Sequence, residues 1–332
     1  MPQLLIWFLV FIASVVVAAA LAPKPPTPKP SSLEDFDIPT AEDGVPIKVV
    51  FGTCFITGAN VVWYGNLECS PIKKKQKGLL GSTTYTAGYW YSMSIHMGLC
   101  HGPVDAVMNL LVGEKDTGFS STAGNGTVSI SARDLFGGEE HEGGIEGKMD
   151  IMMGDQNQAQ NTSLLTYLGN DVPAFRGVVS VLYQGKISAN SPYVKPFSFR
   201  VKRINSGWLG GLPWYSSKMA IADPDAATHI SMNPAHILYQ VLTDTRWGMG
   251  YPSGLIDSTT FTNVADALYT EGFGLNMLWT QQEQISTFIT HVLNHIGGVL
   301  YSDPSTGKFK LMLIRGDYNV ATLPVFDEKS IS

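Results

Sequence analysis

The chain has 332 residues, enough for two domains, and a formal net charge of −6. That negative charge argues against a protein that binds nucleic acid over its whole surface. Only 15% of the residues are charged and 44% are hydrophobic, which is a low charge content for a fully hydrated surface. We therefore expect an assembly to cover much of this surface.

The chain begins with a hydrophobic helix, predicted over residues 1–22. Its residues 4–22 carry no charged side chain and are long enough to span a membrane. A secretory signal peptide would account for the small residues Ala18, Ala20 and Ala22, which resemble a cleavage site, but no basic residue precedes the run. The other interpretations are a membrane anchor and a helix that is buried in an assembly and meets lipid only later. The sequence does not separate these two.

Residues 23–38 are predicted to form a proline-rich tether. Prolines interleaved with lysines occupy its first part, at Pro23, Pro25, Pro26, Pro28 and Pro30. Proline fixes φ and lacks an N–H, so this part is expected to be extended polyproline II. Such a stretch acts as a semi-rigid spacer of roughly 25 Å, and we interpret it as a solvated linker.

The segment 39–205 is predicted to be a β-rich domain. Its expected strands lie at residues 47–51, 60–64, 89–99, 107–112, 178–183 and 196–204. The clearest is 89–99, in which Tyr91, Met93 and Ile95 share one apolar face of a period-two pattern, so that this face packs on a core. A basic run follows the second strand and is predicted to be a solvated loop, with partner contact as the minority interpretation: Lys73, Lys74, Lys75 and Lys77.

The stretch 118–147 is rich in glycine and is predicted to be a loop. It contains Glu139-Glu140-His141-Glu142, whose carboxylates and imidazole raise the question of a metal site. Adjacent residues on a flexible loop rarely converge on one ion, and the HExxH spacing is absent. His96 and His101 have no carboxylate at ligand spacing, so we expect them to be hydrogen-bonded structural histidines. The sequence therefore predicts no metal site.

The segment 206–332 is predicted to be an α+β domain, because helical signals appear after the glycine-rich residues 205–213. Asn233-Pro234 is a cap followed by a first-turn proline, which indicates the start of a helix. Residues 259–271 have apolar side chains at helical spacing, and this helix is expected to stop at Gly272.

A third helix is predicted to begin at Thr280, since Glu283 three residues later completes a capping box. It is expected to end at Gly297-Gly298. The residues after it, 299–302 and 309–314, are predicted to pair as a β-hairpin.

No catalytic motif occurs in the chain, which lacks the G-x-S-x-G elbow, the P-loop and the dinucleotide fingerprint. Asp223 and Asp225 only flank a proline in a predicted loop. The three cysteines, Cys54, Cys69 and Cys100, match no CxxC pattern. We expect buried free thiols, with a bridge between Cys54 and Cys69 as the alternative. The prediction is a protein that is not an enzyme and has no catalytic, cofactor or metal residues.

Several segments, taken in order, resemble the N-terminal part of tail-tip hub proteins of long-tailed bacteriophages. This group contains the lambda-type host-specificity protein and the hubs of gene transfer agents. Such proteins also often open with a hydrophobic segment followed by Ala-Pro-Lys-Pro, as residues 22–25 do here. The segments that carry the resemblance are residues 39–47 (PTAEDGVPI), 50–53 (VFGT), 60–65 (NVVWYG), 91–105 (YSMSIHMGLCHGPVD), 135–138 (LFGG), 142–147 (EGGIEG) and 172–177 (VPAFRG).

The resemblance implies a mainly β protein with an α+β second half and β-barrel-like hub domains, preceded by the hydrophobic helix. It implies a homotrimer at the virion tail tip that closes the tail tube, takes part in opening it for DNA delivery, and is assembled in the host cytoplasm. The implied partners are distal tail and tail-tip ring proteins, the tape measure protein, a second hub chain or central fibre, and the host membrane through residues 4–22. Sequence-specific binding of nucleic acid is not expected.

Members of this family usually run far beyond the segment matched by residues 309–327, whereas this sequence stops at Ser332. The expectation is either a hub split between two chains or a fragment of one hub, so the domain at 206–332 is predicted to be incomplete at its C-terminus. Recognition of a host receptor is not assigned to this chain. The alternative from a different class is a membrane-anchored protein of a bacterial cell envelope, and an enzyme acting on the cell wall is third.

Overall fold

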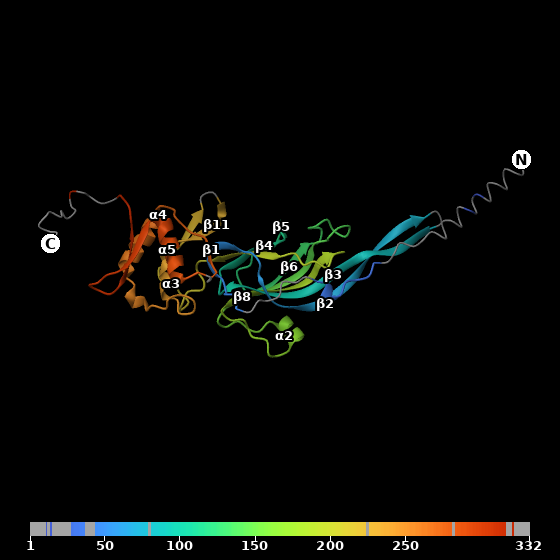
Figure 1. The fold of residues 1–332 in the computed structure, drawn as a ribbon, viewed down its shortest axis with the longest axis horizontal. Helices are drawn as coiled ribbons and strands as arrows, with labels where there is room; N and C mark the ends of the chain where they lie inside the picture. Colours follow the sequence, from blue (N-terminus) through green and yellow to red (C-terminus); the bar gives the residue numbers. More distant parts are fainter. Residues whose placement is uncertain are drawn as a thin grey trace, which may run out of the picture. The chain divides into compact units, whose positions relative to one another are not determined.

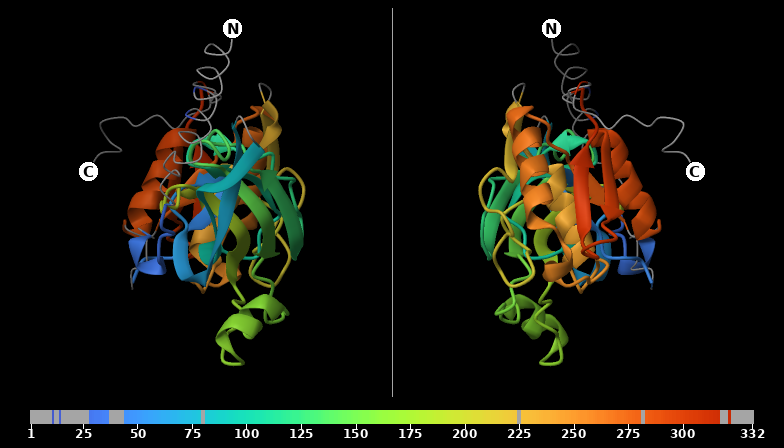
Figure 2. Two further views of the ribbon diagram at one scale, coloured as in Figure 1. Left: turned by 90° about the vertical axis from the view of Figure 1, so that its right-hand side faces the viewer. Right: turned by 90° about the vertical axis from the view of Figure 1, so that its left-hand side faces the viewer.

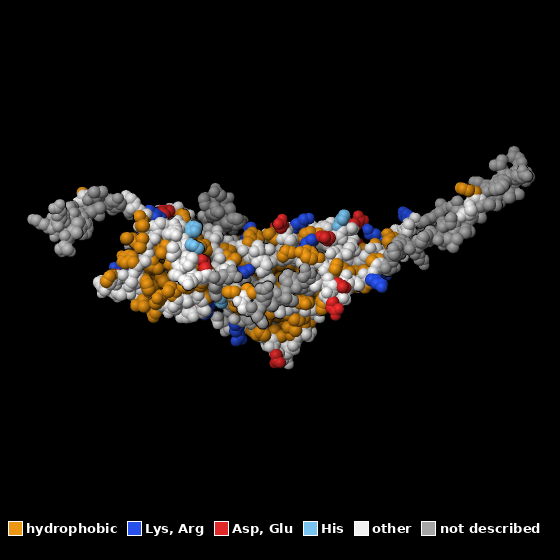
Figure 3. All heavy atoms as spheres, in the orientation of Figure 1, with side chains coloured by type: hydrophobic (Ala, Val, Ile, Leu, Met, Phe, Trp, Pro, Cys, Tyr) orange, Lys and Arg blue, Asp and Glu red, His pale blue; other side chains and the backbone are white. Residues whose placement is uncertain are grey.

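The computed structural model describes residues 11, 14, 28–36, 44–78, 81–223, 226–280, 283–316 and 321 (Figure 1). The chain divides into two compact units. Further views of the ribbon are given in Figure 2, and Figure 3 shows the side chains on one face by type. Unit 1 consists of Met1–Val45, Phe55–Cys100 and Ala106–Val201. Unit 2 consists of Pro46–Cys54, His101–Asp105 and Lys202–Ser332.

Unit 1 is built on an antiparallel sheet with the strand order β2-β3-β8-β7-β6. Its strands are β2 (Asn60–Gly78), β3 (Gly81–His101), β6 (Gly126–Ala132), β7 (Ile145–Met152) and β8 (Val178–Ala189). Within the described ranges no pairing joins the edge strands β2 and β6, so the sheet is open. The prediction of a mainly β protein is confirmed, but this sheet does not close into the barrel-like form that was expected.

The apolar face predicted for β3 is confirmed, since Tyr91, Met93 and Ile95 are all buried. The opposite side of the strand is covered as well, because Trp90 and His96 are also buried. A small helix, α2 (Thr162–Leu168), covers part of the sheet and was not predicted from the sequence. Its Leu164 packs in a cluster with residues of β7 and β8.

Two further segments of unit 1 differ from the prediction. The lysine run at 73–77 belongs to β2 rather than to a loop, because it pairs residue by residue with Ser82–Thr86 of β3. Part of the glycine-rich stretch forms β6 and the start of β7, which pair from Gly126↔Ile151 to Ala132↔Ile145. In β7, Gly147 lies so close to the backbone of Gln184 in β8 that an added Cβ would overlap it. Here glycine permits close pairing of strands instead of marking a loop.

The remaining elements of unit 1 are short. A 3-10 turn, η1 (Leu33–Asp35), lies in the N-terminal segment. The strands β4 (Ala106–Val112) and β5 (Lys115–Asp116) pair with each other. The boundaries between the units fall inside β1 (Val49–Ile56) and near the end of β9 (Phe197–Arg203).

The described part of unit 2 combines three helices with pairs of short strands, as the α+β prediction requires. The helices are α3 (Pro234–Thr243), α4 (Ser258–Thr270) and α5 (Ile285–Ile296), with a 3-10 turn, η2 (Ser253–Leu255). The strands are β10 (Ala220–Asp223) paired with β11 (Ala226–Met232), β12 (Met277–Trp279) paired with the start of β1, and β13 (Gly298–Ser302) paired with β14 (Phe309–Leu313).

The predicted cap signals correctly locate the start of α3 but not that of α5. The side chain of Asn233 accepts a hydrogen bond from the backbone N of Ala235 at 3.1 Å and begins α3, as predicted. The predicted start of the third helix at Thr280 is wrong, since α5 begins at Ile285 and has no side-chain cap. Thr280 directly follows Trp279, which pairs with Val49 in a sheet, so the chain is still leaving an extended strand at this point.

The hydrophobic helix predicted for residues 1–22 lies outside the described residues apart from Phe11 and Ser14. The same holds for residues 23–27 of the tether and for Pro224 and Asp225. In the part of the chain that is described, no helix has the length and apolarity that crossing a bilayer requires.

Candidate functional site

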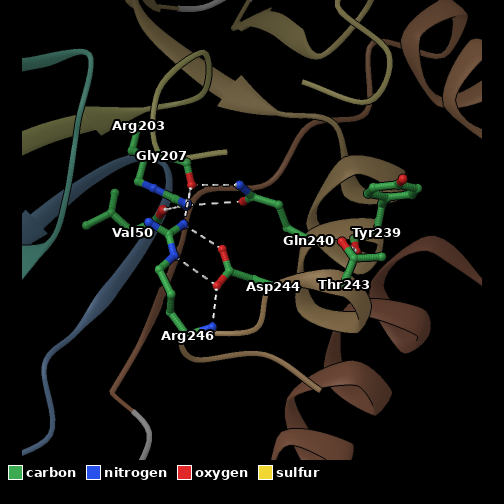
Figure 4. Close-up of polar contacts among 8 residues, drawn as sticks. All are labelled: Val50, Arg203, Gly207, Tyr239, Gln240, Thr243, Asp244 and Arg246. Atoms are coloured by element: carbon green, nitrogen blue, oxygen red, sulfur yellow. Dashed lines mark hydrogen bonds and ion pairs between the residues drawn. The ribbon is translucent and has the colours of Figure 1, made fainter. Parts of the chain in front are cut away.

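The most concentrated group of buried charges in unit 2 lies beside the C-terminal end of α3 (Figure 4). Arg203, the last residue of β9, is 2% exposed, and Asp244, which follows α3, is 1% exposed. Arg246 completes the group and is partly exposed. A charge removed from water must be paired and hydrogen-bonded, so the partners of these side chains define the site.

Arg203 binds three separate segments of unit 2. Its Nη1 donates to the carbonyl oxygen of Val50 at 3.0 Å and to Oε1 of Gln240 at 3.2 Å. Its Nη2 donates to the carbonyl oxygen of Gly207 at 2.8 Å. The guanidinium also lies over the ring of Trp247, 5.6 Å from its centroid. This one side chain therefore connects β1, the loop after β9 and α3.

Asp244 and Arg246 form a fork-to-fork ion pair. Nη2 of Arg246 donates to Oδ2 of Asp244 at 2.6 Å, while Nε and the backbone N of Arg246 donate to Oδ1 at 3.1 Å and 2.8 Å. Charge-assisted bidentate bonds of this kind are among the stronger polar contacts in proteins. They compensate the burial of the Asp244 carboxylate.

The carbonyl oxygen of Gly207 joins the two arginines. It accepts from Nη2 of Arg203 and from Nη2 of Arg246, the latter at 2.9 Å. Gly207 has φ +76°, and an added Cβ would overlap the Arg203 side chain and the carbonyl oxygen of Pro103. Only glycine fits this position without strain.

A pocket of about 390 Å³ adjoins this charge cluster. Trp214 stacks on Tyr239 in its wall, with ring centroids 4.7 Å apart, and Leu212 at its edge is 80% exposed. Figure 4 shows Tyr239 on α3 pointing away from the two arginines. The other lining residues are Trp208, Leu209, Gln240, Thr243, Asp244, Thr245, Gly250, Tyr251, Pro252 and Ser253.

The hydrogen bonds of Arg203, Asp244 and Arg246 run to one another's segments, so the arrangement anchors the C-terminal end of α3. The pKa of His101 is lowered to about 4, mainly by burial and further by the positive charges of Arg203 and Arg246. The imidazole of His101 is therefore neutral near neutral pH. The chemistry of this site is therefore that of a structural cross-link beneath an aromatic pocket.

The acidic loop considered as a metal site does not converge in the structure. The Glu139 carboxylate accepts from Arg133 and from Nε1 of Trp90, the latter at 3.1 Å. Glu140 pairs with Lys74 at 3.1 Å and Glu142 with Lys195 at 2.7 Å. These carboxylates thus bind different cations, and the described ranges hold no group of three or more metal-ligating side chains.

His96 is buried in unit 1 with its ring 4.6 Å from that of Phe175, edge to face. Among the described residues its Nε2 has no hydrogen-bond partner, which differs from the expected hydrogen-bonded histidine. Burial lowers the pKa of His96 to about 4, so the ring is neutral near neutral pH. Its role in the structure is that of a packed core residue.

The three cysteines are free thiols. Cys54 is partly buried, its Sγ donates to the carbonyl oxygen of Phe51 at 3.5 Å, and burial raises its pKa to about 12. Cys100 is buried, as expected, but Cys69 is exposed because it lies on the edge strand β2. No bridge joins Cys54 to Cys69. Asp223 ends β10, while Asp225 is outside the described residues.

The charge cluster was missed in the sequence, although a signal for Arg203 was present. Phe197, Phe199 and Val201 share one face of β9, and Arg203 continues their period of two onto the buried side. An arginine in phase with an apolar strand face requires a buried partner. Nothing local in the sequence identifies Gln240 or Gly207 as that partner.

Comparison with known proteins gives limited similarity. No protein-family model matches the chain, and no curated protein matches it. Among solved structures, a chain of the "Virion of native gene transfer agent (GTA) particle" is similar, with a TM-score of 0.40 and 14% sequence identity. The match covers 89% of this chain and 58% of that chain, so this protein spans less than two thirds of the length of that virion chain.

Proposed function

We propose that the chain is a structural component of a phage-like virion, specifically a tail-tip hub protein that closes the distal end of the tail tube and takes part in opening it. The sequence motifs that resemble tail-tip hubs support this proposal. The observation that carries it is the use of these motifs in the fold, because their described residues fix backbone geometry and are not seen to converge on a reactive cleft.

The motif at residues 91–105 ends in Asp105, which acts as a backbone anchor. Its carboxylate accepts from the backbone N of Ile204 at 2.9 Å, of Asn205 at 3.1 Å and of Ser206 at 2.7 Å. These three donors lie at the point where the chain leaves β9. A carboxylate that binds successive backbone N–H groups sets the direction of a chain, which is a structural role.

The motifs at residues 142–147 and 172–177 serve the same purpose in unit 1. Gly144 and Gly147 lie where an added Cβ would overlap a neighbouring backbone. The side chain of Gln158 donates to the carbonyl oxygen of Ala174 at 2.6 Å, and Nε of Arg176 donates to the carbonyl oxygen of Gln158 at 3.1 Å. A protein whose characteristic residues serve the framework is well suited to a structural role, and we propose that it is not an enzyme.

Purification of virions tests this function. We expect the chain to co-purify with intact particles and an antibody against it to label the distal end of the tail. Recovery of the chain only in detergent extracts of bacterial envelopes, without particles, would instead establish a membrane-anchored envelope protein. Labelling of the head or of the tail shaft would refute the placement at the tip.

The proposal includes three copies around one axis, in contact with the distal tail ring, tail-tip ring proteins and the tape measure, with a second hub chain or a central fibre beyond them. Mass measurement of the isolated tip should give three copies per particle. A count of one or six copies would contradict the trimer without affecting the virion assignment.

For residues 4–22 we propose an uncleaved helix, bundled with its copies on the tail axis, that later meets the host membrane. Burial of this run is favourable because each large apolar side chain left in water forfeits about 1.5–3 kcal/mol. N-terminal sequencing of virion protein should find the run intact. Val16→Lys should impair DNA delivery, because a charge inside a bilayer is costly. Normal delivery by this variant would refute the membrane role.

A further inference from the structure

The distal part of the β2–β3 hairpin is a two-stranded ribbon in unit 1, and we name it the lysine ribbon. It consists of Lys73–Lys77 in β2 and Ser82–Thr86 in β3, which pair with each other from Lys73↔Thr86 to Lys77↔Ser82. Asn190, the first residue after β8, donates to the carbonyl oxygen of Tyr89, so β8 ends before the ribbon begins. Figure 1 shows β2 and β3 continuing beyond the other strands of the sheet.

One face of the lysine ribbon carries three ammonium groups in a row. Side chains two residues apart in a strand lie on the same face, about 6.7 Å apart. Lys73, Lys75 and Lys77 therefore follow one another along this face, and all three are exposed. Each faces a hydroxyl residue across the strands: Lys73↔Thr86, Lys75↔Thr84 and Lys77↔Ser82. The result is a regular ladder of cation and hydroxyl pairs.

The ribbon is positively charged, whereas the rest of the chain has a net negative charge. Residues 69–89 contain four lysines and no aspartate or glutamate, whereas the whole chain has 22 basic and 28 acidic residues. The remaining sequence therefore has 18 basic and 28 acidic residues, a formal charge of −10. In the described ranges one ion pair involves the ribbon, that of Lys74 with Glu140, and Lys74 lies on the opposite face.

We propose that the lysine ribbon binds the phosphodiester backbone of double-stranded DNA without sequence preference. A two-stranded β-ribbon is narrow enough to enter the major groove. Lysine ammonium groups and serine or threonine hydroxyls are common donors to DNA phosphates. Because the backbone winds around the duplex axis, neighbouring phosphates of one strand lie farther apart than their axial rise of about 3.4 Å, so the repeat of about 6.7 Å suits neighbouring phosphates.

The composition of the ribbon favours DNA over other anionic partners. Among its described residues no large hydrophobic side chain is exposed, whereas a protein interface or an interfacial lipid contact uses apolar anchors. Leu79 and Leu80, which connect its two halves in the sequence, lie outside the described residues, and binding to lipid is therefore an explicit arm of the test. Lysines on an edge strand also prevent strand addition, and this simpler role predicts no DNA binding at all.

The test uses the purified full chain and a short labelled DNA duplex, with fluorescence anisotropy measured over a range of salt concentrations. Release of counterions by three lysines gives a slope of log K against log salt of about −2.7, which is a loss of about 40-fold in affinity between 50 and 200 mM salt. Duplexes of unrelated sequence should bind equally. Absence of binding at the lowest salt would overturn the proposal.

The variant K73Q/K75Q/K77Q should weaken DNA binding by more than about tenfold at low salt. The control K29Q/K148Q/K308Q removes the same charge from other exposed positions and should change binding by less than about twofold. The variant K73R/K75R/K77R changes the same three side chains but keeps their charges, and it should retain DNA binding. Retained binding would show that the glutamine variant loses affinity because it loses positive charge. Equal losses in the two glutamine variants would overturn the proposal, as would tighter binding to phosphatidylglycerol vesicles than to DNA.

Discussion

One group of charged residues in unit 1 and the charge cluster in unit 2 are placed in opposite ways. In unit 1, Arg133 and Lys186 lie over the ring of the buried Trp90, at 5.0 and 5.3 Å from its centroid, and pair with partly exposed glutamates at the surface. In unit 2 the Asp244 carboxylate and the Arg203 guanidinium are almost fully buried.

This difference teaches where charge contributes to stability. Water solvates a broken surface pair, so its loss costs little, whereas a broken buried pair leaves a charge without compensation. The apolar face of β3 in unit 1 is therefore expected to tolerate no unpaired charge, whereas unit 2 is expected to depend on its buried charge cluster.

The largest effect is expected when a charge enters the core of unit 1. Ile95 is 1% exposed in the centre of β3, so Ile95→Asp removes apolar packing and buries an unpaired carboxylate at a cost of about 5 kcal/mol. Hydrogen exchange should show loss of protection throughout the sheet β2-β3-β8-β7-β6, and we expect defective or tailless particles. The control Ile95→Val should cost only about 1 kcal/mol. Normal infectivity of Ile95→Asp would show that this strand face is not core.

The next effect comes from removing the buried carboxylate of unit 2. Asp244→Ala removes the buried carboxylate and leaves the partly exposed Arg246 without its anion, which should lower the free energy of unfolding by about 3 kcal/mol. Chemical unfolding followed by hydrogen exchange in α3 measures the loss. A change below about 1 kcal/mol would mean that the cluster is solvated and that the two units do not differ as described.

Acid should destabilise unit 2 more than unit 1. Burial holds the pKa of His96 in unit 1, and of His101 and His236 in unit 2, at about 4. An unfolded histidine has a pKa near 6.5, so below that pH the unfolded state binds protons that the folded state does not, and stability falls until about pH 4. Between about pH 6.5 and 5 the cost is up to about 2 kcal/mol for the buried His96 and His236, and it is smaller for the partly exposed His101.

Among the histidines whose side chains are described, two such residues lie in unit 2 and one in unit 1, so hydrogen exchange at pH values from 7 to 5, corrected for the intrinsic rate, should show a larger loss in unit 2. His236→Gln should reduce that difference. Equal losses in both units would contradict the assignment of the acid sensitivity to these side chains.

The smallest effect is expected at the surface of unit 1. Glu146 pairs with Lys186 at 2.5 Å, and the pKa of Glu146 is lowered by the hydrogen bond from Lys186. Both side chains are partly exposed, so Glu146→Ala should cost less than about 1 kcal/mol and should be weaker still in high salt. Because it deletes the same type of group as Asp244→Ala, it is the matched comparison. A loss of several kcal/mol would remove the contrast between the units.

Local chemistry in the sequence determined several elements. Asn233 caps α3 because its side chain reaches a free backbone N–H two residues away, and Gly272 follows α4 with φ +68°. The alternation along β3 correctly places Tyr91, Met93 and Ile95 in the core. The mainly β character and the α+β second half also follow from such short-range patterns, which need no knowledge of distant segments.

Other features were decided by the tertiary structure alone. The lysine run forms a strand because Ser82–Thr86 pair with it, and Gly147 belongs to a strand because another backbone approaches it closely. The helix α5 begins at Ile285, later than the predicted Thr280, because the preceding Trp279 pairs with Val49 in a sheet.

The charge cluster shows the same limit at the candidate site. Arg203 was detectable from its phase in β9, but its partners Val50, Gly207 and Gln240 come from separate segments of the chain. A single side chain's preference is local, whereas compensation of a buried charge depends on which distant groups the fold brings within hydrogen-bonding distance.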